Sequence, residues 1–384
     1  MNDSSSKTPR QQGLYLPAEW HPHVGCWIGW PERADNWPQP SRRVHPVMVS
    51  LIHAIARYEP VTVVCSAAAF ASVCAQLLPS REPPDGLQPP STVRIVEMSC
   101  NDCWLRDTAP LFVIPGAELP FASVAGVDSA FNAWGGSGGG CYPDWSLDAQ
   151  VARKVLQLER LPRFVNPMVL EGGSITVDGE GTLITTEQCL LNANRNPGWS
   201  RQRIEAQLRA YLGVECVLWL PLGIAGDADT DGHVDNLCVF LRPACVALHW
   251  AAGDECCERA ARALTEARDA RGRRLQVVRL TAPPPLYRRT EDLPAVDAVS
   301  AAGAQAHRPR EAGTLLPASY VNFYRANGAV IMPAFGHAAS DAAARSALQE
   351  ALPEVEMVQI EGAREILLGG GNIHCLTQQQ PQWP

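Results

Sequence analysis

The sequence predicts an α/β protein in which strands and helices alternate along the whole chain. Short apolar runs rich in β-branched residues recur, and several are separated by segments with the apolar spacing of amphipathic helices. Two stretches far apart in the chain also resemble each other, which indicates a repeated strand-and-turn unit. Strands and helices interleaved in this way are typical of α/β folds.

Individual elements can be assigned from these patterns. The expected strands cover residues 61–65, 92–96, 111–114, 182–185, 217–220, 239–241, 275–280 and 329–332. The expected helices cover residues 46–58, 146–158, 200–212, 254–270 and 340–352. Ser200, followed by Gln202, Arg203 and Ile204, has the pattern of a helix N-cap.

No linker divides the chain, although 384 residues are enough for two or three domains. The proline-rich stretches 79–90 and 281–317 have the length of loops, and strands and helices resume after each without a change in composition. We therefore expect a disordered polar segment over residues 1–12 and a single domain over residues 13–384.

Internal similarity refines the fold prediction. Residues 170–177 read LEGGSITV and residues 368–375 read LGGGNIHC, which match at Leu, two glycines and Ile. A weaker match links RDTAPLFV at 106–113 with VDNLCVFL at 234–241, which share Asp and Phe. Repetition at such long spacing predicts a pseudosymmetric ring of αβ units rather than a solenoid.

Composition narrows the choice of partners and compartment. The formal net charge of −8 argues against nucleic acid, whose binding needs clustered Lys and Arg, and favours a small cation. The polar start lacks a secretory signal, and no uncharged apolar run approaches the ~20 residues that span a bilayer. Thirteen scattered cysteines in such a chain are expected to be reduced, mostly buried thiols, which predicts a cytoplasmic protein.

Several common catalytic motifs are missing from the sequence. It contains no GxSxG, GxxxxGK[ST] or HExxH, and the glycine-rich stretch 134–145 lacks the GxGxxG order, so we expect a loop there. Cys100 and Cys103 form a lone CxxC, and Cys256 and Cys257 are adjacent, so a four-cysteine zinc site is not expected. A structural zinc site or a redox pair at Cys100 and Cys103 stays a minor alternative.

Three acidic or histidine-containing clusters and one cysteine remain as candidates for chemistry. The clusters are DCWLRD at 102–107, LEGGS at 170–174 and GDADTDGHVDN at 226–236, and the cysteine is Cys375. Alone, each cluster also fits a structural role, and Cys375 also fits a buried last strand. Together they suit covalent catalysis, since a thiol nucleophile needs a base and a histidine can serve as both acid and base. Surrounding carboxylates favour a planar, donor-rich cation, which indicates a guanidinium carbon as the electrophile.

Long blocks of the sequence carry a resemblance that runs nearly from end to end. The blocks are LPAEWHPHVGCWIGWPER from position 16, NDCWLRDTAP from 101, FNAWGG from 131, LEGGSITVDGEGTLITTEQCLLNANRNP from 170, DTDGHVDN from 229, PASYVNFY from 317 and GGGNIHCLTQQQP from 369. In these blocks the chain resembles the agmatine deiminases of the guanidino-group-modifying superfamily, which are related to bacterial peptidylarginine deiminases.

The resemblance implies a pentein fold, in which five ββαβ-like units form a pseudosymmetric propeller around a single catalytic site. It also implies hydrolysis of agmatine to N-carbamoylputrescine and ammonia without cofactor or metal, through a covalent S-alkylthiouronium intermediate. The residues that match the family's catalytic positions are Cys375 as nucleophile, His233 as general acid and base, and Glu171, Asp107 and Asp235 as carboxylates that hold the guanidinium. His374 is not expected to be the base, because adjacent strand residues face opposite ways.

Substrate contacts are expected from five further positions, and the substrate tail is where the sequence departs from the family. The expected contacts are Trp104, Asp229, Gly369, Gly370 and Asn372. Asp229 is expected to pair with the distal ammonium. Gly369, at the position matching Glu171, is expected to leave room for the substrate. The departures are Ala109 for Gly, Thr176 for His, Ala228 for Glu, the loss of an acidic pair after Trp250, and Gly336-His337 in place of an Asp-rich turn. Catalytic positions are thus retained while acidic residues near the tail are fewer.

Several alternatives remain open at this level. Another alkylguanidine or a peptidylarginine-like substrate could replace agmatine, and an amine could replace water on the same intermediate, as in an amidinotransferase. An inactive relative that only binds a cation is the alternative from a different class. The resemblance implies a small guanidine partner and a homodimer or larger homo-oligomer, while charge and hydropathy predict no nucleic-acid and no membrane partner.

Overall fold

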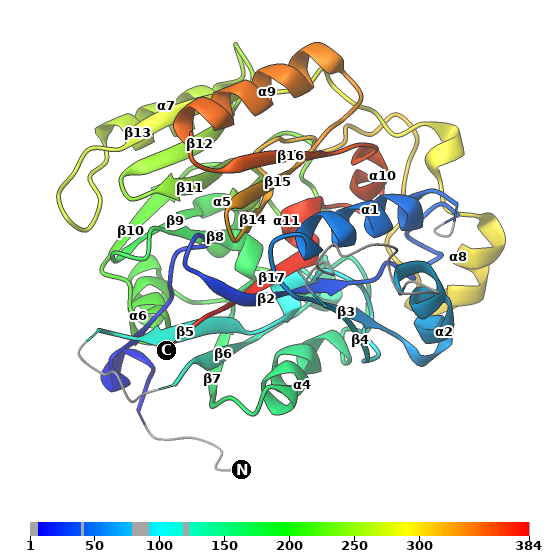
Figure 1. Ribbon diagram of the computed structural model, residues 1–384, viewed down its shortest axis with the longest axis horizontal. Helices are drawn as coiled ribbons and strands as arrows, with labels where there is room; N and C mark the ends of the chain where they lie inside the picture. Colours follow the sequence, from blue (N-terminus) through cyan, green and yellow to red (C-terminus); the bar gives the residue numbers. More distant parts are fainter. Residues whose placement is uncertain (1–6, 40–41, 79–91, 118–122, 384) are drawn as a thin grey trace, which may run out of the picture.

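Five small sheets with helices packed against them make up the protein (Figure 1). The computed structural model describes residues 7–39, 42–78, 92–117 and 123–383. Within these residues, two sheets have four strands and three have three strands. The expected α/β class is confirmed.

The five sheets share one arrangement of strands and helices. Each contains two antiparallel strands, and a helix then leads the chain into a third strand parallel to the second. Parallel neighbours require such a crossover, because the chain must return to the edge where the previous strand began. This order is the ββαβ unit expected from the sequence, and its closed fivefold arrangement stays a prediction.

The strands of the five sheets have the following bounds. The sheets are β1 (Leu14–Tyr15), β5 (Leu111–Pro115), β6 (Ala125–Ala130) and β7 (Arg163–Val169); β8 (Ile175–Val177), β9 (Thr182–Thr186) and β10 (Cys216–Leu220); β11 (Cys238–Arg242), β12 (Cys245–Trp250) and β13 (Gln276–Thr281); β14 (Tyr324–Ala326), β15 (Ala329–Pro333) and β16 (Glu356–Ile360); and β17 (Thr377–Pro381), β2 (His23–Gly29), β3 (Val61–Cys65) and β4 (Val93–Glu97). The last of these sheets joins the two ends of the chain, because β17 pairs with β2 (Figure 1).

One crossover helix belongs to each unit. These helices are α1 (Val44–Ala56), α4 (Val151–Leu158), α6 (Arg201–Leu212), α7 (Glu255–Glu266) and α9 (Ala338–Ala351). The other helices are α2 (Ala67–Leu77), α3 (Leu105–Thr108), α5 (Glu187–Leu190), α8 (Val296–Ala302), α10 (Arg364–Leu367) and α11 (Ile373–Leu376), and the 3-10 turns are η1 (Arg10–Gln12), η2 (Gly136–Gly138), η3 (Asp148–Gln150), η4 (Gly172–Ser174), η5 (Val234–Asn236), η6 (Thr290–Asp292) and η7 (Gly303–Gln305).

Apolar faces at helical spacing attach these helices to their sheets. On α7, Ala260, Ala261 and Leu264 lie on one face and pack in a core cluster with Val246 and Leu248 of β12. Fully burying a side chain such as Leu264 contributes about 1.5–3 kcal/mol. Comparable clusters hold the other crossover helices against their own sheets.

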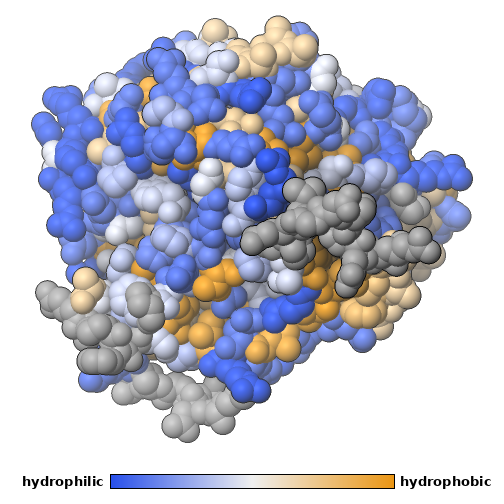
Figure 2. All heavy atoms as spheres, in the orientation of Figure 1, coloured by the Kyte–Doolittle hydropathy of each residue, from blue (hydrophilic) through white to orange (hydrophobic). Residues whose placement is uncertain are grey.

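The outer surface is mostly hydrophilic in the view of Figure 2, with smaller hydrophobic areas in both its upper and lower halves. Among the described residues, no helix has both the length and the apolar character that a membrane crossing requires. All thirteen cysteines are free thiols, as expected, and nine of them are buried.

Short turns just before the first strand of the units meet at the centre of the molecule. Four of them are α3 before β5, η4 before β8, η5 before β11 and α11 before β17. The turn α3 contacts both α11 and η4, and η4 contacts η5. In Figure 1, α11 lies near the middle of the view, between β14 and β17. Side chains on these turns are therefore brought together although they are far apart in sequence.

The predicted strands agree with the structure to within one residue at either end. The predicted helix over 254–270 is shorter, since α7 ends at Glu266, and the one over 146–158 divides into η3 and α4. Ser200 accepts a hydrogen bond from the backbone nitrogen of Arg203, which confirms the predicted N-cap. Residues 10–12 form η1 instead of a disordered segment, because Arg10 donates to the carbonyl oxygen of Val214 at 2.9 Å. Residues 1–6 and the proline-rich stretch 79–90 lie outside the described residues.

Candidate active site

Cys375 lies on a single helical turn rather than on a strand. Asn372 caps the start of α11, because its side-chain oxygen accepts from the backbone nitrogen of Ile373 at 2.9 Å. The hydroxyl of Thr377 donates to the carbonyl oxygen of His374 at 3.0 Å, where the chain leaves the helix for β17. The expectation of a buried last strand through Cys375 was therefore wrong, since these polar side chains stabilise one turn of helix first.

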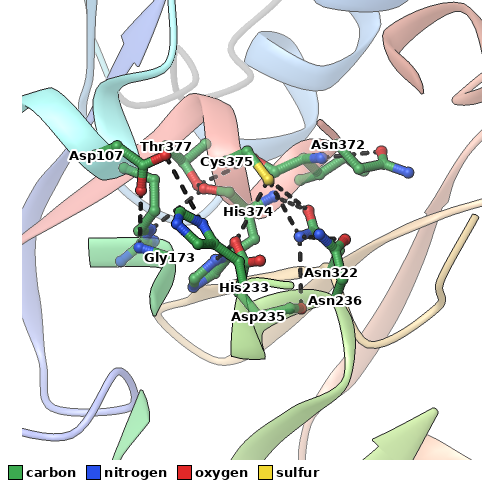
Figure 3. Close-up of polar contacts among 12 residues, drawn as sticks. Asp107, Gly173, His233, Asp235, Asn236, Asn322, Asn372, His374, Cys375 and Thr377 are labelled. Carbon is green, nitrogen blue, oxygen red and sulfur yellow. Dashed lines mark hydrogen bonds and ion pairs between the residues drawn. The ribbon is translucent and has the colours of Figure 1, made fainter. Parts of the chain in front are cut away.

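The thiol of Cys375 faces two polar side chains (Figure 3). Nδ2 of Asn322 donates to Sγ at 3.2 Å, and Sγ lies 3.4 Å from Oδ2 of Asp235. Burial, followed by the charges of Asp235 and Asp107, raises the pKa of the Cys375 thiol well above its usual value. The thiol is therefore protonated in the free protein, and a cation bound beside these carboxylates would favour the thiolate.

His233 stands on the other side of the site and is 1% exposed. Its Nδ1 lies 3.9 Å from Oδ2 of Asp107, and its Nε2 has no hydrogen-bond partner among the described residues. Burial alone would lower the pKa of His233, but Asp107, Cys189 and Glu171 outweigh burial and raise it well above the usual value. The imidazole is therefore positively charged near neutral pH and can act as a general acid.

Asp107 is fixed from two directions. Trp134 donates from Nε1 to Oδ2 of Asp107 at 2.9 Å, and the backbone nitrogen of Gly173 donates to Oδ1 at 2.8 Å. Burial and the nearby charges of Asp235 and Glu171 raise the pKa of Asp107, although His233 acts in the opposite direction. Three carboxylates in one buried region repel one another, so the site favours a cationic ligand.

Two carboxylate oxygens of this site are buried and lack a donor within the described part of the chain. Glu171 is paired through Oε1 with Nε of Arg195 at 2.6 Å, which leaves its Oε2 without a partner. Asp235 uses Oδ2 for His374 and Cys375, and its Oδ1 has no partner. An unsatisfied buried acceptor costs about 1–3 kcal/mol, so a ligand with several N–H donors would relieve this cost.

His374 is held between two carboxylates. Its Nδ1 lies 2.9 Å from Oδ2 of Asp235, and its Nε2 lies 2.8 Å from Oε1 of Glu19. Both ring nitrogens are occupied, so His374 is placed to orient Asp235. The reason expected from alternating strand faces does not apply, because Cys375 and His374 lie on α11.

A narrow cavity of about 20 Å³ leads to Cys375. It is lined by Trp104, Asp107, Trp134, Cys141, Asp229, Thr230, Asn236, His307, Gly369, Gly370, Gly371 and Cys375. This space holds about one water molecule, so a larger ligand can enter only if lining side chains move. Trp104 stacks on Trp37 at 5.5 Å and closes one side of the cavity.

The three consecutive glycines are needed because other side chains occupy the space. A Cβ atom on Gly369 would lie 2.2 Å from the Trp37 ring, and one on Gly370 would lie 2.3 Å from Oδ2 of Asp229. One on Gly371 would lie 2.7 Å from the Trp104 ring. Gly369 therefore makes room for Trp37; it also lines the cavity, and its expected role in leaving room for a substrate stays a prediction. Its expected equivalence with Glu171 fails, since Glu171 lies four residues before β8 whereas Gly369 lies eight before β17.

Two other expected substrate contacts are arranged differently in the structure. Asp229 is bound by two arginines, Arg308 at Oδ1 and Arg310 at Oδ2, the latter at 2.6 Å. Burial would raise the pKa of Asp229, but Arg310 and Arg308 outweigh burial and hold it below the usual range. Its charge is therefore already neutralised. Asn372 caps α11 with its side chain pointing away from Cys375, and it is not among the residues that line the cavity (Figure 3).

Some residues around the site were missed by the sequence reasoning. Asn322, beside the thiol, lies in the PASYVNFY block, and Trp134 lies in FNAWGG, so both were present in the blocks that carry the resemblance. Arg195 lies in the block from 170 to 197 and had the same signal. Arg308 and Arg310 lie outside these blocks, and nothing in the local sequence shows which carboxylate an arginine will meet.

One group of described residues has the geometry to hold a metal ion. Possible ligand atoms of Glu171, Cys189 and His233 lie within 4.8 Å of one another, and all three residues are buried. Burial raises the pKa of the Cys189 thiol, although His233 partly offsets this effect. Cys100 and Cys103 are not part of this group.

Comparison with known proteins places this arrangement among deiminases. The family model described as Porphyromonas-type peptidyl-arginine deiminase matches residues 15–381. The chain is 49% identical to an agmatine deiminase of Medicago truncatula over 97% of this chain and 98% of that protein. It is also 49% identical to an agmatine deiminase of Pseudomonas aeruginosa over 98% of each. The solved structure of an agmatine deiminase from Enterococcus faecalis, 36% identical, superposes with a TM-score of 0.89 and covers 100% of both chains.

Proposed function

The chain belongs to the Porphyromonas-type peptidyl-arginine deiminase family, and from this membership we propose that it hydrolyses agmatine to N-carbamoylputrescine and ammonia. High identity to agmatine deiminases over nearly the full length supports the substrate. The single observation that carries the chemistry is the convergence of a thiol, a histidine and three carboxylates on one buried site.

The carboxylates bind the guanidinium in this proposal. Glu171 Oε2 and Asp235 Oδ1 are buried acceptors without donors in the described structure, and the guanidinium supplies N–H donors to them. Its positive charge also lowers the pKa of the nearby Cys375 thiol, which then loses its proton. Substrate binding thus generates the nucleophile.

Cys375 and His233 carry out the covalent steps. The thiolate attacks the guanidinium carbon and forms a C–S bond, and the His233 imidazolium gives its proton to the departing nitrogen. The C–N bond breaks, ammonia leaves, and an S-alkylthiouronium remains on Cys375. Neutral His233 then takes a proton from water, and the resulting hydroxide attacks the same carbon. The C–S bond breaks, the new hydroxyl gives its proton to the departing sulfur, and the carbamoyl product and the Cys375 thiol are released.

Substitution of the nucleophile tests this proposal. We expect Cys375→Ala to lower kcat for ammonia release from agmatine by at least about 1,000-fold, because no other group can form the covalent intermediate. Cys256→Ala, which removes a thiol from α7, should keep native activity. Mass spectrometry of the native protein mixed rapidly with agmatine should detect the adduct on Cys375. Native activity in Cys375→Ala would refute the role of this thiol.

A second substrate is favoured by one observation. Because Arg308 and Arg310 neutralise Asp229, the ammonium of agmatine finds no free carboxylate there. An alkylguanidine without a distal charge would not need a free carboxylate at this place. Comparison of kcat/KM for agmatine, arginine and butylguanidine decides between them, and product analysis with an added amine separates hydrolysis from amidinotransfer.

Cellular setting and assembly are also proposed. Thirteen free thiols support a reducing, cytoplasmic location. We expect a homodimer or larger homo-oligomer, which light scattering coupled to gel filtration would show directly.

A further inference from the structure

A second, larger cavity of about 400 Å³ borders the catalytic one. Asp229 and Gly370 line both cavities, so they form a wall shared between the two. Ala228 and Thr314 are exposed at its rim, whereas Leu367 is buried at its base. The cavity is therefore open to solvent on one side and reaches the catalytic wall on the other.

The charge lining this second cavity is positive. Arg288, Arg308 and Arg310 line it, together with the carboxylates of Asp229 and Glu311. Asp229 is shared by two of the arginines. Glu311 is exposed and forms no ion pair with any described residue. The arginines therefore exceed the carboxylates that neutralise them.

Arg288 is the unusual member of this group. It is 4% exposed, and its Nη2 donates to the carbonyl oxygen of Leu368 at 3.1 Å. Its Nε and Nη1 are buried and have no acceptor within the described residues. Burial, and then the charge of Arg310, lowers the pKa of Arg288 to about 10, so it remains charged at neutral pH. The carboxylate of Asp292 also acts on Arg288, but it is already paired with Arg43 and Arg364.

We propose that this second cavity binds a small anion with a carboxylate or phosphate group, held by Arg288 and Arg308. Such an anion supplies acceptors to the buried Arg288 donors, which lack them in the described structure. Arg308 is one third exposed and contacts Asp229 with a single nitrogen, so it can turn toward an anion. Arg310 is held more firmly, because it also donates to Asn36 and to the carbonyl oxygen of Gly369.

Anion binding would also affect the catalytic site. When Arg308 turns to the anion, Oδ1 of Asp229 loses its partner and becomes free to accept the distal ammonium of the substrate. This second part rests on the proposed hydrolysis of agmatine. The anion should therefore raise the affinity only for substrates with a distal cation, because only these use the freed Asp229 carboxylate.

Direct binding tests the site independently of activity. The native full-length protein is titrated with inorganic phosphate and, separately, with succinate in a calorimeter; we expect saturable 1:1 binding to at least one, and the tighter of the two identifies the anion class. Arg288→Met should weaken binding at least about tenfold, because it removes the buried charge. The matched control Arg289→Met, whose side chain is largely exposed, should bind like the native protein.

A second variant keeps this test decisive if Arg288→Met fails to fold. Ala228→Glu places a carboxylate at the rim of the cavity, where it can pair with the arginines, and should also weaken anion binding at least about tenfold. Absence of saturable binding by the native protein would refute the site. Equal binding by the native protein and both variants would refute it as well.

Kinetics test the coupling. Saturating anion should lower KM for agmatine about tenfold with kcat unchanged, and should leave KM for butylguanidine unaltered. Arg308→Gln should show the lower agmatine KM without anion and no further response to it. Anion binding without any change in agmatine KM would refute the coupling. If no condition gives agmatine turnover, the proposed function fails, while the binding titration still decides the anion site.

Discussion

Asn322 shows how a single residue outside the catalytic set can control the thiol. Its Nδ2 donates to Sγ of Cys375 at 3.2 Å, and its Oδ1 accepts from the backbone nitrogen of His374 at 3.0 Å. This amide therefore both stabilises the thiolate and orients α11. Burial and carboxylates raise the thiol pKa, and the Asn322 hydrogen bond partly opposes that effect.

Replacement of Asn322 should shift the pH dependence of the reaction. The Asn322 hydrogen bond lowers the thiol pKa, so Asn322→Ala should raise it further and move the limb of the kcat/KM profile that reports the thiol to higher pH. The raised His233 pKa sets the opposite limb, where activity falls once the imidazolium loses its proton. We expect kcat to fall about 10–100-fold in Asn322→Ala. A kcat/KM profile with both limbs unshifted would show that Asn322 is only structural.

At the scale of elements, the turn η4 shows why a glycine must precede β8. A Cβ atom on Gly173 would lie 2.6 Å from Nδ1 of His233 and 3.0 Å from Oδ1 of Asp107. His233 directly precedes η5 and Asp107 lies in α3, so the absence of a side chain allows three turns to meet. The sequence identified Gly173 as part of a glycine-rich turn, but not what occupied the space beside it.

Gly173→Ala should therefore disturb the site through its added methyl group. Backbone strain should not contribute, because Gly173 is not among the glycines with a positive φ. His233 or Asp107 must move to accept the new methyl group, and we expect kcat to fall at least about 100-fold because small misplacements of catalytic groups are costly. Gly138→Ala is the matched control, since a Cβ atom on Gly138 would meet no other atom within 4 Å, and it should keep native kcat. Steady-state ammonia release measures both. Native kcat in Gly173→Ala would mean that His233 needs no such space.

The whole molecule depends on the pairing of its two ends. β17 supplies the antiparallel neighbour of β2, so the sheet that begins near the N-terminus is completed only by the end of the chain. The catalytic turn α11 leads directly into β17. Closure of this last unit therefore fixes the position of Cys375 as well.

Removal of residues 377–384 should prevent stable folding. The deletion leaves the edge of β2 unpaired and exposes core residues such as Ile28, and unpaired edges promote aggregation. We expect loss of cooperative thermal unfolding and loss of soluble protein. A chain that ends at Gln382 keeps β17 and should unfold like the native protein. A soluble, cooperatively folded protein lacking residues 377–384 would contradict this view of closure.

The sequence by itself determined the elements and the chemistry-bearing residue types. Strands such as β3 follow from short apolar runs rich in β-branched residues, and helices such as α6 follow from periodic burial and a cap; both signals depend on neighbours a few residues away. Matching blocks placed Cys375 and His233 in a family. The helical turn at Cys375 was missed because four residues are too few to show a helical period.

Only the tertiary structure decided which charges meet. Asp229 was expected to face a substrate ammonium, and the fold instead pairs it with Arg308 and Arg310, about 80 positions later in the chain. Coulomb attraction and burial act through space, whereas sequence patterns report only local spacing. For the same reason, the arginine-lined cavity beside the catalytic site becomes visible only when the chain is folded.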